Sequence, residues 1–199
     1  MSDNFSALED MFTRLGAEEQ QLGSGQVLFR QGDAPRGLYL LTIGSVDLVR
    51  WTRAGDKALI HAAHAGETFA EASLFVAAYH CDAVAREASV VRCCRTRPLM
   101  AALENDGTLA ALLFRHLAET VRDARRLLEL RRIVPLTDRL YQRLQELAGE
   151  DGTLPPGMKL GHIADEIAAT PEAVYRAAAS LEATGRIRRP GRGVICLVT

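Results

Sequence analysis

Glu172 and Arg176 are the residues whose types and spacing most directly suggest a chemistry. They stand one helical turn apart, with Tyr175 beside them. A guanidinium can donate two hydrogen bonds to guanine O6 and N7, and a carboxylate can accept one from cytosine N4. The three side chains are therefore predicted to read base edges in DNA. The alternative is an i,i+4 surface ion pair, which stabilises a helix by only about 0.2–0.5 kcal/mol.

A cluster of arginines follows close behind in the sequence. Residues 184–199 contain four arginines and no acid, grouped around Pro190-Gly191. We expect a hairpin of two short strands that turns at this Pro-Gly pair and lies on the phosphate backbone; the alternative is a solvated surface turn. The predicted phosphate contacts are Lys159, Thr170, Arg188, Arg189 and Arg192.

Two short helices are needed to position these side chains. Ile163 and Ile167 lie four residues apart in the first, and Ala168-Ala169 follows as a tight turn. Thr170 is a favourable N-cap and Pro171 suits the first position of the second helix. The buried stripe of that helix is expected to be Val174, Ala177, Ala178 and Leu181, which leaves Glu172, Tyr175 and Arg176 outward. This arrangement predicts a helix-turn-helix.

A long helix is predicted from Leu109 to about Arg132, a stretch without proline or glycine. Its apolar residues recur at steps of 3, 4, 3 and 4, the spacing of a coiled-coil seam. A second apolar face remains to pack on the rest of the same domain, so we expect a second copy of the chain at the seam. The alternative is one amphipathic helix lying on its own domain. The seam consists of Phe114, Leu117, Val121, Ala124 and Leu128, and the second face of Leu109, Leu112, Leu113, His116 and Leu127.

The first half of the chain has the pattern of a small β domain. From about residue 26 to 97, short apolar runs are interrupted every 8 to 12 residues by turn signals, as in an antiparallel barrel or sandwich. Residues 5–21 are expected to form a short helical lead-in. Pro135 should end the long helix, with a hinge near Val134-Pro135 and a new helix from Thr137 to Ala148.

Four segments resemble, in the same order, parts of the Crp/Fnr family of bacterial transcription regulators: FRQGDAPRGLYLLTIGSVDL (29–48), GETFAEASLF (66–75), LTDRLYQRLQELA (136–148) and TPEAVYR (170–176). The resemblance implies a homodimer with parallel central helices that binds a palindromic DNA site and contacts RNA polymerase. In the family a glutamate and an arginine of the recognition helix read bases, and they match Glu172 and Arg176. Pro171 stands where an arginine often precedes the glutamate, which departs from the cyclic-AMP type.

The predicted fold is therefore α+β, with three parts. Residues 1–108 form an antiparallel, jelly-roll-like β-roll of the effector-binding type, residues 109–134 a central dimerisation helix, and residues 135–199 a winged helix-turn-helix.

The resemblance also identifies a candidate effector pocket, which is altered in this chain. Relatives that bind cyclic AMP hold its ribose with a glutamate, matched by Glu71, and its phosphate with an Arg-Ser pair, replaced by Cys81-Asp82. Like charges about 4 Å apart repel by roughly 4 kcal/mol at an effective dielectric of 20. The positions that contact the adenine match Ala124 and Arg125. We therefore do not expect cyclic AMP to bind, and predict an effector-independent regulator or one with an unknown signal.

A thiol- or haem-based sensor of the same family is the alternative. Cys81 is the better thiol candidate because it is expected in a loop, whereas Cys93-Cys94 should split across the two faces of a strand. His80 and Cys81 lie near the loop where a haem-binding relative places its ligands, but adjacent strand residues point to opposite faces. Residues 1–80 contain no cysteine, which excludes the usual N-terminal iron–sulfur arrangement.

Composition excludes several other classes of protein. The 25 acidic and 24 basic residues nearly cancel, and 48% of the chain is hydrophobic, as in ordinary globular proteins. No apolar run reaches the roughly 20 residues of a membrane span, and the start lacks a secretory pattern, so a cytoplasmic location is expected. The four cysteines lack CxxC spacing. His61, His64 and Glu67 follow one another at steps of three, and residues three apart in a strand face opposite ways, so we predict no metal site there. Because no nucleophile–base or metal set is expected to assemble, we do not predict an enzyme.

Overall fold

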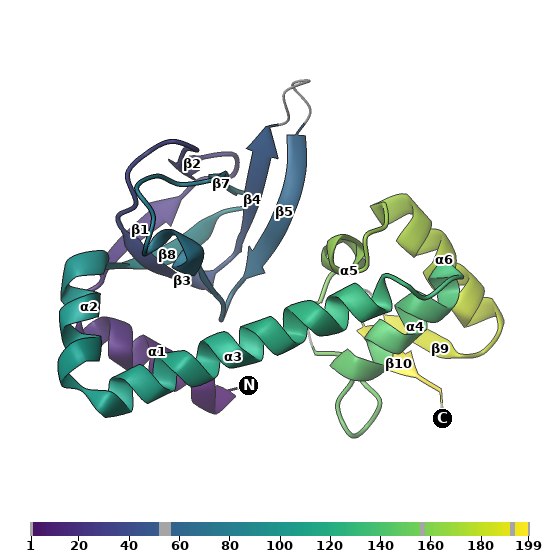
Figure 1. The fold of residues 1–199 in the computed structure, drawn as a ribbon. Helices are drawn as coiled ribbons and strands as arrows, with labels where there is room; N and C mark the ends of the chain where they lie inside the picture. Colours follow the sequence, from purple (N-terminus) through teal and green to yellow (C-terminus); the bar gives the residue numbers. More distant parts are fainter. Residues whose placement is uncertain (1, 52–56, 156–157, 192–193, 199) are drawn as a thin grey trace. The chain divides into compact units, whose positions relative to one another are not determined.

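The computed structural model of the chain describes residues 2–51, 57–155, 158–191 and 194–198 (Figure 1). Two compact units make up the chain, residues 1–118 and residues 119–199. The division falls inside the long helix α3 (Gly107–Leu130), whereas the sequence prediction placed boundaries at residue 108 and near Val134-Pro135. Among the described helices, none combines the length and the hydrophobicity that a membrane span requires.

The first unit is built around two four-stranded antiparallel sheets. The sheet orders are β1-β8-β3-β6 and β2-β7-β4-β5, which confirms the predicted β-roll. The helices α1 and α2 and the first part of α3 belong to the same unit (Figure 1). Its elements are α1 (Ser2–Arg14), β1 (Glu18–Leu22), β2 (Val27–Phe29), β3 (Gly37–Ile43), β4 (Ser45–Trp51), β5 (Lys57–His64), β6 (Thr68–Phe69), the 3-10 helix η1 (Glu71–Ser73), β7 (Asp82–Ala85), β8 (Ser89–Arg95) and α2 (Thr96–Asn105).

Aromatic rings fill the interior of the β-roll. Phe29 stacks on Tyr79 with ring centroids 3.7 Å apart, and Tyr39 stacks on Phe69 at 5.1 Å. Phe29 also lies 5.7 Å from Tyr39, which joins the two pairs. Successive residues of a strand point to opposite faces, and the chain uses this alternation to build a second core outside the roll. That second core contains Leu38, Leu40 and Cys94 of the strands and Leu8, Phe12, Leu99, Leu109 and Leu113 of the helices.

The N-terminal lead-in differs from the prediction of a helix over residues 5–21. Helix α1 ends at Arg14, and Gly16 takes a left-handed φ of 65° that turns the chain away. Residues 18–22 then form β1, which pairs with β8 about 70 residues later in the chain, from Glu18 opposite Cys93 to Leu22 opposite Ser89. The sequence EEQQL shows no apolar alternation, so this strand depends on a long-range partner that local patterning does not reveal.

The second unit contains the end of α3, three further helices and a two-stranded sheet. These are α4 (Leu136–Leu147), α5 (Leu160–Glu166), α6 (Pro171–Ala183), β9 (Ile187–Gly191) and β10 (Val194–Leu197). The predicted helices are confirmed within a few residues. Leu140, Leu144, Ile163 and Val174 pack together in the core of this unit, and each is at most 1% exposed.

The Pro190-Gly191 pair, which was predicted to form the turn of the hairpin, lies in a strand instead. Pro190 and Gly191 belong to β9, and Gly191 pairs with Val194 of β10. Residues 192–193, which include the predicted phosphate contact Arg192, lie outside the described residues. A proline can occupy an edge strand because it needs no ladder hydrogen bond there.

Candidate nucleic-acid interface

Helix α6 presents the predicted base-reading residues to solvent. It begins as predicted, with Pro171 at the first helical turn and the Thr170 hydroxyl accepting a hydrogen bond from the Ala173 amide at 3.3 Å. Glu172 and Arg176 are exposed, and Tyr175 is 52% exposed. The predicted stripe on the opposite side, Val174, Ala177, Ala178 and Leu181, is buried. The helix is thus held rigidly from behind while its front carries hydrogen-bonding groups.

The turn before α6 is tight and built from alanines. Ala169 donates its amide to the Ala164 carbonyl at 2.9 Å, and Ala168 adopts a left-handed φ of 52° that is uncommon outside glycine. The short helix α5 starts after Lys159, whose side chain is exposed. Lys159 and Thr170 therefore lie at the N-terminal ends of α5 and α6, where backbone N–H groups favour anions.

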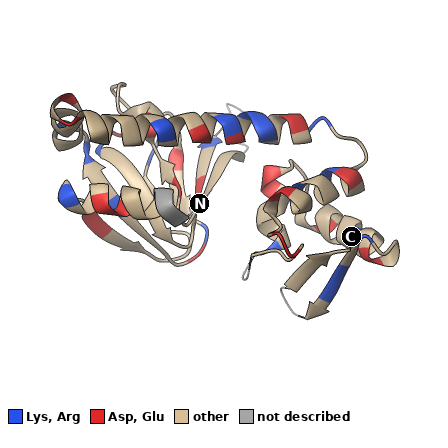
Figure 2. Ribbon diagram, turned by 90° about the horizontal axis from the view of Figure 1, so that it is seen from below, with Lys and Arg blue, Asp and Glu red and all other residues tan. Residues whose placement is uncertain are grey.

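The described arginines in and just before the C-terminal hairpin make different contacts. Arg186 lies over the Tyr141 ring at 3.9 Å and pairs with Asp138 at 2.8 Å. Arg189 pairs with Glu182 of α6, through its Nε at 2.8 Å. Arg188 is exposed and makes no ion pair with the described residues. Figure 2 shows basic residues on this hairpin beside the mixed charges of the neighbouring helices.

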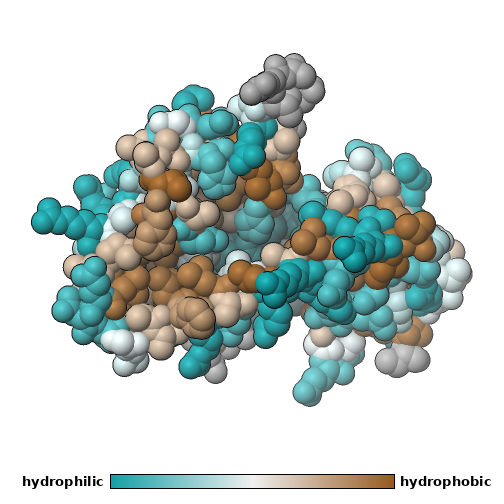
Figure 3. Space-filling model, in the orientation of Figure 1, coloured by the Kyte–Doolittle hydropathy of each residue, from teal (hydrophilic) through white to brown (hydrophobic). Residues whose placement is uncertain are grey.

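The predicted seam on α3 is exposed in the single chain. Phe114 is 75% exposed, Leu128 57% and Val121 49%, and Ala124 is also exposed, whereas Leu117 is half-buried. The second face behaves as predicted in the first unit: Leu109 and Leu113 are buried, and His116 hydrogen-bonds the Thr68 hydroxyl at 2.7 Å. Hydrophobic side chains form a band along the face of the first unit shown in Figure 3.

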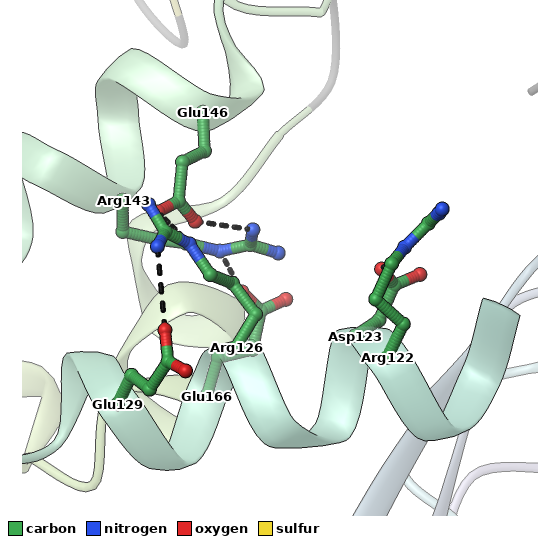
Figure 4. A network of polar contacts seen from close by, with 7 residues as sticks. All are labelled: Arg122, Asp123, Arg126, Glu129, Arg143, Glu146 and Glu166. Atoms are coloured by element: carbon green, nitrogen blue, oxygen red, sulfur yellow. Dashed lines mark hydrogen bonds and ion pairs between the residues drawn. The ribbon is translucent and has the colours of Figure 1, made fainter.

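A network of ion pairs joins the end of α3 to α4 and α5 within the second unit (Figure 4). Arg126 pairs with Glu146 at 2.6 Å, and Arg143 pairs with Glu166 at 2.7 Å. Arg143 also contacts Glu146 at 3.3 Å, so the groups form one chain of alternating charges.

Two further arginines bind backbone carbonyls next to this network. Arg131 donates to the Glu166 carbonyl at 3.2 Å, and Arg139 donates to the Ile133 and Ile167 carbonyls at 2.9 Å. Cations at a helix C-terminus satisfy its unpaired carbonyls. Sequence reasoning missed these residues, because only the i,i+3 pairs within one helix have a local signal.

The candidate effector residues are arranged differently from the sequence-based expectation. Asp82 does not present its carboxylate to the interior of the β-roll. The carboxylate accepts hydrogen bonds from the backbone amide of Gln31 at 2.6 Å and from Trp51 Nε1 at 3.1 Å. The next residue, Ala83, lies in the interior core, so alternation places Asp82 on the outer face. Two donors of the protein therefore engage this carboxylate, and its repulsion of a phosphate stays a prediction.

Cys81 is buried rather than accessible, which corrects its selection as the best thiol candidate. Burial raises the pKa of its thiol, so the reactive thiolate is disfavoured. His80 beside it is exposed, and its carbonyl accepts a hydrogen bond from Arg50 Nε at 3.1 Å. Arg50 thus brings a guanidinium close to position 81. The sequence analysis missed it, because Arg50 comes from the neighbouring strand β4. Cys93 and Cys94 lie in separate cores, as predicted.

Glu71 lies in η1 with one carboxylate oxygen, Oε2, buried and without a hydrogen-bond partner among the described residues. Burial raises the pKa of this carboxyl group. The other two effector candidates, Ala124 and Arg125, are exposed on the part of α3 that belongs to the second unit.

His61 and Glu67, which are six residues apart in the sequence, do meet. Their Nε2 and Oε2 atoms are 3.3 Å apart, and the His64 amide donates to the same carboxylate at 3.1 Å. The register of β4 and β5 shifts beside His61, which changes the side-chain alternation there. Among the described residues, no group of three or more potential ligands is placed to hold a metal ion.

Comparisons with known proteins agree with this architecture. Residues 19–106 match the cyclic nucleotide-binding domain family. No curated protein sequence matches the chain significantly. Among solved structures, FixK2 from Bradyrhizobium japonicum is 21% identical with a TM-score of 0.71, covering 92% of this chain and 93% of that one.

Two other structures are similar over nearly the whole length. A CRP-family transcriptional regulator from Thermus thermophilus is 22% identical, with a TM-score of 0.62 and coverage of 90% of this chain and 92% of that one. The c-di-GMP responsive global regulator CLP of Xanthomonas campestris is 19% identical, with a TM-score of 0.61 and coverage of 98% and 99%. Residues 19–106 are thus similar to the cyclic nucleotide-binding domain family, and the chain as a whole has the same fold as these solved transcription regulators.

Proposed function

We propose that this chain is a sequence-specific DNA-binding transcription regulator, with a binding rather than a catalytic function. The observation that carries the proposal is the front of α6, where Glu172, Tyr175 and Arg176 are exposed on a helix packed firmly from behind. A recognition helix needs this combination, because base edges are read by rigidly positioned side chains in the major groove. The exposed Arg188 on the adjoining hairpin suits a phosphate contact.

The regulator acts as a homodimer on a palindromic site and contacts RNA polymerase. The dimer is supported by the exposed row of Phe114, Val121 and Leu128, which recur at seven-residue intervals on one helix. A heptad spacing keeps apolar side chains facing a partner helix along its length. Two-fold symmetry of the protein then matches two-fold symmetry of the DNA site.

The effector site does not bind cyclic AMP in the usual manner, and DNA binding is either independent of an effector or controlled by another signal. A neutral, buried thiol at Cys81 supplies no positive charge for a phosphate. The aromatic stacks of Phe29 with Tyr79 and Tyr39 with Phe69 fill the interior of the roll. The Xanthomonas structure is described as c-di-GMP responsive, so this fold is compatible with signals other than cyclic AMP.

Replacing Arg176 by alanine tests the base-reading role. We expect a loss of about 1–3 kcal/mol at a duplex selected from random DNA, with weak binding to an unselected duplex nearly unchanged. Fluorescence anisotropy on both duplexes measures the two affinities. Arg97→Ala, which removes an exposed arginine in α2, is the matched control. An equal loss of affinity on both duplexes would show that Arg176 binds phosphate rather than bases.

A further inference from the structure

Glu182, near the end of α6, binds one residue of the hairpin through several atoms. One carboxylate oxygen accepts a hydrogen bond from the Arg189 backbone amide at 3.2 Å, and the other accepts one from Arg189 Nε at 2.8 Å. The terminal Nη2 of the same guanidinium also contacts the second oxygen. The hydrogen bond from Arg189 lowers the pKa of the Glu182 carboxyl, which is therefore ionised at neutral pH.

The strand geometry separates Arg188 from Arg189. Ile187 is buried in the core of the second unit, and residues two apart in a strand share a face. Arg189 therefore lies on the same face of the hairpin as Ile187, where α6 supplies Glu182, and Arg188 projects from the opposite face. Arg186, the other described arginine of this stretch, is already engaged by Asp138 and Tyr141.

We propose that Glu182 determines which hairpin arginine contacts DNA, by keeping Arg189 as its own partner and leaving Arg188 to bind phosphate. This inference rests on the proposed DNA-binding function. Charge-assisted hydrogen bonds of this kind are stronger than hydrogen bonds between neutral groups. Two guanidinium nitrogens of Arg189 are directed at the Glu182 carboxylate, whose negative charge offsets that of the arginine, so Arg189 offers a phosphate much less net charge than Arg188 does. Glu182 is thus a positioning residue for the hairpin.

The dependence of DNA affinity on salt counts phosphate contacts directly. Each neutralised phosphate adds about 0.9 to the slope of log affinity against log salt concentration. In a dimer each substitution occurs twice, so the loss or gain of one contact per protomer changes the slope by about 1.8. The probes are an unselected duplex of fixed sequence and a duplex selected from random DNA, titrated by anisotropy between about 50 and 200 mM salt.

Four variants of the full chain distinguish the roles of the two arginines. Arg188→Ala should make the slope shallower by about 1.8, whereas Arg189→Ala should leave it at the wild-type value. Glu182→Gln should release Arg189 and make the slope steeper. The double variant Glu182→Gln with Arg189→Ala should return to the wild-type slope, because the released arginine is then absent.

Two results would overturn the role of Glu182. One is a shallower slope for Arg189→Ala, equal to that of Arg188→Ala, which would show that DNA displaces the carboxylate. The other is a double variant as steep as Glu182→Gln alone, which would mean that the lost negative charge acts without Arg189. Absence of binding to either duplex by the wild-type protein would instead contradict the proposed function. Melting temperatures of all variants establish that each is folded.

Discussion

The dimer seam makes the most direct quantitative prediction, at Phe114. A phenylalanine side chain can bury about 150–250 Å², so Phe114, which is 75% exposed in the single chain, offers roughly 150 Å² to a partner. If a partner helix covers half of that area, burial contributes about 2 kcal/mol per protomer at about 25 cal/mol per Å². Two-fold symmetry counts the contact twice, which gives about 4 kcal/mol, or roughly 1000-fold in the dimer dissociation constant.

Phe114→Ala is therefore expected to weaken dimerisation by about three orders of magnitude while leaving the monomer folded. Sedimentation equilibrium over a range of protein concentrations measures the dissociation constant, and circular dichroism monitors folding. Phe75→Ala is the matched control, because Phe75 is 78% exposed but lies in the loop after η1 rather than on α3. Equal dissociation constants for wild type and Phe114→Ala, or an equal loss in the control variant, would refute the assignment of the seam.

Two further predictions concern the first unit. Cyclic AMP at millimolar concentration should leave the melting temperature unchanged, since a ligand that binds the folded state raises it; a rise that disappears in Arg50→Ala would contradict the proposal and identify Arg50 as the phosphate contact. Burial raises the pKa of the Cys81 and Cys93 thiols, and it raises the pKa of the Cys94 thiol to about 11. Alkylation near pH 8.5 should therefore label these three cysteines far more slowly than half-buried Cys196. The stability that the buried neutral thiols contribute is present below the unfolded pKa of about 8.5 and decreases as pH rises above it. Peptide mapping in buffer and in urea measures the labelling, and rapid modification of Cys81 in the native protein would restore it as a thiol-sensor candidate.

Local sequence patterns were sufficient to predict the helices that have a strong hydrophobic periodicity, together with the side chains that these helices carry. The N-cap Thr170, the stripe from Val174 to Leu181 and the exposed positions of Glu172 and Arg176 follow from helical periodicity, and the structure has them where they were predicted. The two faces of α3 were also predictable, because side chains three and four apart on a helix share a face.

The effector site was less predictable, because its residues depend on pairing between distant strands. The resemblance matched Asp82 to a phosphate-binding position, but the pairing of β7 with β4 places its carboxylate against Trp51 and the backbone amide of Gln31. Arg50 lies next to residues 80–81 for the same reason.

The amino-acid sequence of this protein determined the order of its helices and strands and the candidate base-reading residues, since both depend on short-range periodicity and capping. Tertiary contacts decided which charged side chains are available for contacts outside the protein. Arg188 and Arg189 are adjacent and chemically identical in the sequence, yet Glu182 engages one and the other is exposed. The physical reason is that an arginine's availability depends on whether a carboxylate from another element reaches its guanidinium, and folding alone sets that distance.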